Sequence, residues 1–150
     1  MSRLVRMYDK GSRVDYGEIR ARMARVAELL ASYLNEHYRG PPGFSKHTIM
    51  GPVGKLISVL ESGRFMDKDA LLGYIINIHT NLSGPISKEA VEQLEKAVSE
   101  LLEIRSQVST RMWIRLLREL DYAVYKHKMK YIVERAAAKA QAKKSIGGGE

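Results

Sequence analysis

The first 25 residues are rich in arginine, the residue type best suited to holding phosphate groups. Arginine outnumbers lysine six to one in this stretch, and only Asp9, Asp15 and Glu18 oppose seven cations. A guanidinium group can bind two phosphate oxygens at once, which an ammonium group cannot. We therefore predict an arm that lies along the phosphates of a polyanion, in preference to a solvated helix face or a contact with a neighbouring subunit. The residues of this predicted arm are Arg3, Arg6, Lys10, Arg13, Arg20, Arg22 and Arg25.

A second stretch, YAVYKHKMKY at 122–131, alternates tyrosines with lysines. Aromatic rings can stack on bases while the ammonium groups bind phosphates. Alternatively, one edge of tyrosines belongs to the core and the lysines are merely solvated. The sequence leaves both interpretations open. The further candidate contacts to nucleic acid are Lys126, Lys128 and Lys130 from this stretch, with Arg39 and Lys46 closer to the N-terminus.

The net charge of +8 is distributed unevenly along the 150 residues. Residues 1–47 carry a net charge of +4, residues 48–104 carry −3 and residues 105–150 carry +7. A chain with a pI near 9.7 favours an acidic partner, and nucleic acid is the first candidate. We therefore expect both ends of the chain to bind the partner, while the acidic middle stays away from DNA.

Several kinds of chemistry lack the residues they need. The chain has no cysteine, which excludes disulfides and thiolate sites. His37, His47, His79 and His127 are dispersed without metal-ligand spacing, and His79 is expected to be a hydrogen-bonded core residue. No nucleophile elbow or phosphate-binding loop occurs, because GPVGK lacks the required spacing. We predict no catalytic residue, no metal site and no cofactor.

The apolar residues repeat at helical spacing nearly throughout, and no alternating strand pattern of useful length occurs. We predict an all-α fold with helices near 15–38, 52–62, 67–82, 87–105 and 110–144. A small bundle of about four helices would span 48–135. Residues 1–47 would form a basic helical N-terminal arm, and residues 48–150 the bundle with its long basic C-terminal helix. The residues expected to be buried together are Leu72, Ile75, Ile76, Leu94, Leu101 and Leu117.

No apolar run approaches the roughly 18 residues that span a bilayer, and the N-terminus has no apolar signal region. The sequence therefore predicts an intracellular, cytoplasmic protein rather than a membrane-spanning or secreted one.

The layout is similar to that of the major capsid proteins of rod-shaped and filamentous archaeal DNA viruses. The likeness is carried by a basic helical arm broken at Pro41-Pro42, by segments that begin at Gly51-Pro52 and Gly84-Pro85, and by ALLGYIINIHTNLSGPISKEAVEQLEKAV. It implies a virion subunit, assembled in the host cytoplasm, that pairs with itself or with a paralogue. Such pairs wrap A-form double-stranded DNA inside a tube of N-terminal helices, so the N-terminal cations would line the DNA. No small-molecule substrate is implied, and a membrane envelope is neither predicted nor excluded.

Two alternatives come from other classes of protein. The small subunit of a CRISPR effector complex is also a basic all-α bundle of this size, and it would bind RNA or displaced single strands along a filament. A small helical enzyme such as a mutase would need arginines that converge inside the bundle. The predicted core stripes are aliphatic instead, which counts against an enzyme.

Overall fold

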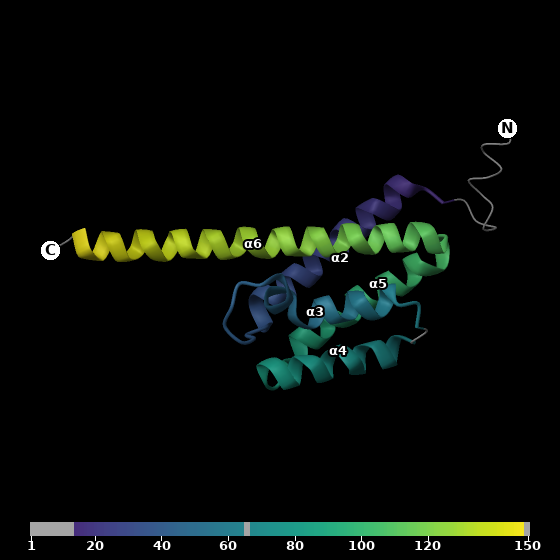
Figure 1. The fold of residues 1–150 in the computed structure, drawn as a ribbon, viewed down its shortest axis with the longest axis horizontal. Helices are drawn as coiled ribbons and strands as arrows, with labels where there is room; N and C mark the ends of the chain where they lie inside the picture. The colour runs from purple at the N-terminus through teal and green to yellow at the C-terminus, as the bar shows by residue number, and fades with distance from the viewer. Residues whose placement is uncertain (1–13, 65–66, 149–150) are drawn as a thin grey trace.

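The fold is all-helical over the residues that the computed structural model describes, which are 14–64 and 67–148, with side chains up to residue 143. Five helices follow one another in this part of the chain, and it contains no strand (Figure 1). The all-α prediction is confirmed, but the predicted bundle of about four helices over 48–135 is not, because the helix at residues 16–37 packs into the same core and makes five. The helices are α2 (Tyr16–His37), α3 (Lys46–Glu61), α4 (Lys68–Ser83), α5 (Lys88–Gln107) and α6 (Thr110–Gly148).

Side-chain caps define where four of these helices begin. Asp15 accepts a hydrogen bond from the Glu18 amide at 3.1 Å, and Asp67 accepts one from the Ala70 amide at 2.7 Å. Ser45 and Ser87 cap α3 and α5 in the same way. Such caps satisfy amides that have no partner inside the helix. The helices predicted near 15–38, 67–82 and 87–105 therefore agree with α2, α4 and α5 to within two residues.

Helix α3 departs from the prediction, which placed its start at residue 52. It begins at Lys46 and contains a kink at Gly51, whose φ of 48° and ψ of −128° are not helical. The sequence indicates a start at the Gly-Pro pair because proline suits a first turn. In the structure Pro52 does begin the regular part of the helix, and residues 46–50, expected to be a connector, form a preceding helical turn.

The five helices form a closed ring around one core. In order around the ring, α2 packs against α5, α5 against α4, α4 against α3, α3 against α6 and α6 against α2. Tyr33 and Leu34 of α2 have no exposed surface and belong to the same core as residues from all the other helices. A boundary at residue 47 therefore does not separate two cores. Residues 16–37 are part of the bundle, while residues 1–13 lie outside the described residues.

The predicted core is correct with one exception. Leu72, Ile75, Leu94, Leu101 and Leu117 are all buried in one cluster. Ile76 is only partly buried and packs against the edge of that cluster, because Ile75 occupies the inward position of α4.

Helix α6 is much longer than the bundle beneath it. At a rise of about 1.5 Å per residue, its 39 residues span about 58 Å. Its first half is part of the core through Trp113, Leu116, Leu120 and Val124. Every residue from 133 to 143 is exposed, and Figure 1 shows this end of α6 projecting past the other helices. Over the described residues, positions 133–143 of this basic helix are therefore open to solvent.

Candidate nucleic-acid interface

Of the seven cations in the predicted N-terminal arm, Arg20, Arg22 and Arg25 lie within the described residues. Arg3, Arg6, Lys10 and Arg13 are outside the described residues, so their contact with phosphates stays a prediction. Arg20, on the first turns of α2, points across to α6, where its Nε lies 3.4 Å from Oε1 of Glu119. Both side chains are 48% exposed, so water screens this pair and Arg20 can exchange it for another anion.

Arg22 is held in an ion network between α2 and α5. Its Nε donates to Oε1 of Glu100 at 3.1 Å, and its Nη2 lies 3.3 Å from Oε1 of Glu103. Nη1 also reaches Gln107 at 3.5 Å. The hydrogen bond to Glu100 raises the pKa of Arg22, and the side chain is only 13% exposed. Arg22 thus ties two helices together and has little of its charge left for a polyanion.

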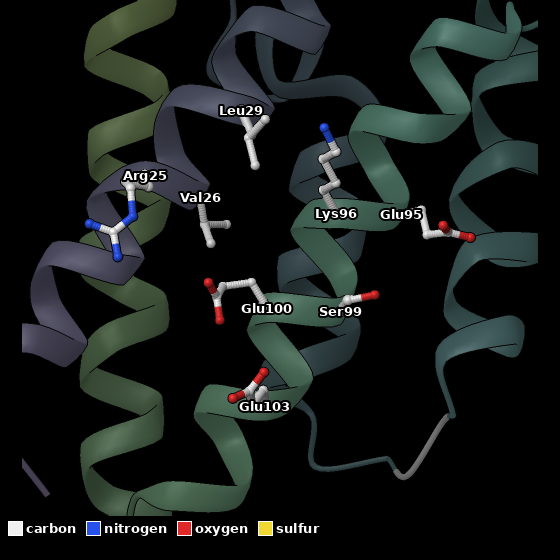
Figure 2. A pocket seen from close by; sticks show the side chains of 8 residues that line it. All are labelled: Arg25, Val26, Leu29, Glu95, Lys96, Ser99, Glu100 and Glu103. Carbon is white, nitrogen blue, oxygen red and sulfur yellow. The ribbon is translucent and has the colours of Figure 1, made fainter.

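Arg25 faces the same acidic side of α5. It lines a cavity of about 450 Å³ between α2 and α5, to which α5 contributes Glu95, Lys96, Glu100 and Glu103. Figure 2 shows the Glu100 carboxylate pointing toward α2 and that of Glu95 pointing away from Arg25. Val26 and Leu29 line the cavity on the α2 side. Arg25 itself forms no ion pair in the described chain, although negative charge on Glu100 and Glu103 would disfavour a phosphate there. Arg20 thus faces α6 while Arg22 and Arg25 face α5, and their contact with phosphates stays a prediction.

Two further predicted contacts, Arg39 and Lys46, lie outside both stretches. The Arg39 side chain is exposed, whereas the Lys46 ammonium already has partners. Lys46 forms an ion pair with Asp121 of α6 and also lies over the Tyr125 ring, 5.7 Å from its centroid. The Arg39 amide donates to the Ser83 hydroxyl at 2.8 Å, which fixes the backbone after α2 and leaves the guanidinium in solvent.

The tyrosines and lysines of 122–131 do not share one surface. Tyr122 is 62% exposed, and the Lys126 ammonium lies 5.5 Å from the centroid of its ring. Tyr125 is partly buried against the core. Lys128 donates to the Leu34 carbonyl at 3.2 Å on the opposite side of α6. Tyr125 therefore fits the core interpretation, whereas Tyr122 and Lys126 are exposed and their contact with nucleic acid stays a prediction. Lys130, at a third position around α6, lines a shallow cavity with Glu28, Glu36 and Glu134.

Three arginines of α6 form a basic surface that was not predicted from the sequence. Arg111, Arg115 and Arg118 line a groove of about 830 Å³ along the first turns of α6, together with Tyr122 and one acid, Glu119. Within the described part of the chain, none of the three arginines has a hydrogen-bond or ion-pair partner. Their spacing of four and three residues places them on one helix face, opposite the buried one. That spacing is visible in the sequence and is the signal that could have identified them. We call Arg111, Arg115, Arg118, Tyr122 and Lys126 the α6 stripe.

His79 is a buried, hydrogen-bonded core residue, as the sequence predicted. His79 is 1% exposed, and its Nδ1 lies 2.6 Å from the Tyr33 hydroxyl. Burial raises the pKa of Tyr33, so the phenol stays protonated, and the tautomer of the imidazole determines which of the two groups donates. Burial, and secondarily the charge of His37, lowers the pKa of His79.

Over the described residues, no three His, Asp or Glu side chains come together as a metal site, and no helix has the length and apolar character to cross a bilayer.

The buried His79 predicts a loss of stability in mild acid. Its pKa is lowered below the ordinary value of 6.5, so below that pH the unfolded chain binds a proton that the native state does not. The free energy of unfolding should therefore fall as pH drops from about 6.5 toward the folded pKa, by up to about 1.4 kcal/mol per pH unit. Urea titrations at pH 7.5, 6.5 and 5.5 measure this slope. His79→Gln should flatten it and exposed His47→Gln should not; an unchanged slope in His79→Gln would contradict the assignment.

Comparisons of the chain with family models, with curated proteins and with solved structures found no match.

Proposed function

We propose that this protein is a structural, non-catalytic subunit that binds double-stranded DNA through its phosphates and polymerises along it into a helical nucleoprotein filament, as a capsid subunit does. The observation that carries the proposal is the α6 stripe. Three arginines without ion-pair partners in the described chain share an outward face with an exposed tyrosine and a lysine. Residues 111–126 cover about 22 Å of helix, enough to follow several phosphates of a duplex.

The composition of the stripe suits a coat that must cover any sequence. Arginine and lysine bind phosphate oxygens without reading the bases. Asparagine and glutamine, which form paired hydrogen bonds to adenine, are absent from the stripe. Binding through this surface should depend on salt and be indifferent to sequence. The predicted cations of residues 1–13 would extend the same surface, because α2 begins beside the α6 turn that carries Glu119, the partner of Arg20.

The projecting end of α6 supports polymerisation. Residues 133–143 are all exposed over about 16 Å of helix, and five of them are alanines with no core to cover. An isolated alanine-rich segment is only marginally helical in water, so contacts with a neighbouring subunit would stabilise it. The acidic face of α5 would then point away from the DNA, as the distribution of charge in the sequence predicts.

The test is to mix the purified full chain with linear duplex DNA and to examine it by negative-stain electron microscopy. We expect regular filaments on duplexes of any sequence, with affinities for two unrelated duplexes that agree within about tenfold, or 1.4 kcal/mol. Salt titrations should show a steep fall in affinity. Failure to form filaments, or a larger preference between duplexes, would contradict the proposal.

The small subunit of a CRISPR effector complex remains a second candidate, favoured by one observation. Tyr122 is 62% exposed and has a lysine beside its ring, which is the arrangement on which single-stranded bases stack. This candidate predicts that the chain binds single-stranded RNA more tightly than duplex DNA and that Tyr122→Ala removes the difference. The proposed capsid subunit predicts the opposite preference and a small effect of Tyr122→Ala.

A further inference from the structure

A second basic cavity lies where α6 passes the loop between α2 and α3. Its volume is about 360 Å³, and residues of the distal half of α6 and of the loop at residues 38–45 line it. This cavity is separate from the α6 stripe, because its α6 residues stand on a different side of that helix. Its charged residues are Arg39 from the loop and Lys128, Arg135 and Lys139 from α6.

The charge of this cavity is uncompensated. Four cations line it, no aspartate or glutamate does, and none of the four forms an ion pair within the described chain. The contrast with Arg22 and Lys46 is clear, since both of those face carboxylates. Lys128, Arg135 and Lys139 are spaced by seven and four residues, so one face of α6 presents them together.

Tyr131 organises two of the cations. Arg135 Nη1 donates to the Tyr131 hydroxyl at 2.9 Å, and Lys128 Nζ and Arg135 Cζ lie 5.2 and 5.6 Å from the centroid of the same ring. Burial, and secondarily the charge of Arg135, lowers the pKa of Lys128. Two like charges held near one ring repel each other, and a bound anion would relieve that repulsion. Lys128 uses one N–H to donate to the Leu34 carbonyl, which leaves two N–H donors for a ligand.

The loop side of the cavity allows a ligand to come close to the protein backbone. Gly40 and Gly43 line it and carry no side chain into the space. The hydrogen bond from the Arg39 amide to Ser83 fixes the start of this loop. Asn35 also lines the cavity, and its NH₂ group is a hydrogen-bond donor. Every polar side chain around the cavity can therefore act as a donor.

We propose that this cavity is a phosphate-binding site that clamps one backbone phosphate of a bound nucleic acid where α6 leaves the bundle. Four convergent cations with no carboxylate select a compact, multiply charged anion, and arginine matches the geometry of phosphate oxygens. That the phosphate belongs to the backbone of a nucleic acid rests on the proposed function. The cations of the cavity alone indicate a phosphate group. The site adds a fixed contact point whose centre lies about 20 Å along α6 from the centre of the α6 stripe, near Arg118.

The test compares two double variants of equal charge. Arg39→Gln/Lys139→Gln removes exposed cations of the cavity, and Lys55→Gln/Lys88→Gln removes two exposed cations on α3 and α5. Fluorescence anisotropy with a labelled duplex of about 20 base pairs measures affinity against salt. The cavity variant should bind at least about tenfold more weakly at about 0.1 M salt, with a slope flatter by about 0.9, as expected when one phosphate is no longer neutralised. The control variant should change affinity less than about threefold. Equal behaviour of the two variants would overturn the clamp.

A second arm separates this inference from the proposed function. Inorganic pyrophosphate is titrated into the full chain while NMR follows the pH titration of the Lys128 side chain. Binding should raise the pKa of Lys128 in the wild type and not in Arg39→Gln/Lys139→Gln. If pyrophosphate binds but duplex DNA does not, the proposed function fails and the cavity is a site for free phosphate. If duplex DNA binds and the cavity variant matches its control, the clamp fails and the proposed function stands.

Discussion

Replacing Arg111, Arg115 and Arg118 together by glutamine is expected to weaken binding to duplex DNA by roughly 10²- to 10³-fold at about 0.1 M salt. The three guanidinium groups line one groove and have no partner in the described chain, so each is available to a phosphate. Each phosphate that is no longer neutralised should flatten the plot of log K against log salt by about 0.9, and three should flatten it by about 2.7. The same change should appear on unrelated duplexes, because binding to phosphates carries no sequence information.

The control for this variant removes the same charge elsewhere. Lys55, Lys88 and Lys96 are exposed on α3 and α5, so their triple replacement by glutamine matches the change in net charge without touching α6. The slope should then stay within about half a unit of the wild type. Circular dichroism of both variants should match the wild type, since all six side chains lie outside the core. If the α6 variant keeps the wild-type slope, the α6 stripe is not the DNA-binding surface.

The sequence predicted the helices well because their signals are local. Apolar spacing of 3.6 residues identified the stripe of α2 from Ile19 to Leu34, and every member of it is buried. The caps at Asp15 and Ser87 lie within three residues of the amides they bind. The kink at Gly51 was not predicted because there the backbone passes so close to the Tyr38 ring that a Cβ would clash with it. Tyr38 lies thirteen residues earlier, and no local sequence pattern indicates such a contact.

The candidate site was predicted less well because charge alone does not reveal partners. Arg22 and Glu100 are 78 residues apart, and only the packing of α2 on α5 brings them together. A local count of cations therefore gives Arg22 the same weight as an unpaired arginine. The prediction for Ile76 was wrong for a related reason, since it adjoins Ile75 on α4 and only the tertiary arrangement decides which of the two faces inward. Pairing between distant helices thus determines which cations remain available to a ligand.

Gly51→Ala is expected to destabilise the bundle by about 2–6 kcal/mol. The backbone of Gly51 has a φ of 48° and a ψ of −128°, a region that residues with a Cβ adopt only at a cost of about 1–3 kcal/mol. The added Cβ would also lie 2.6 Å from Cζ of Tyr38. That ring is 9% exposed and sits 6.2 Å from the His79 ring, so it has little room to move. Overpacking of this kind adds about 1–3 kcal/mol.

Urea unfolding monitored by circular dichroism gives the free energy of each variant. Gly73→Ala on α4 is the matched control, because its Cβ would meet nothing within 4 Å and alanine favours a helix by up to about 1 kcal/mol. Repeating Gly51→Ala in a Tyr38→Leu background separates the two causes. The clash with the ring is then absent, so the remaining destabilisation measures the backbone strain alone. A Gly51→Ala protein with the wild-type midpoint would show that neither the positive φ nor the contact with Tyr38 constrains the kink of α3.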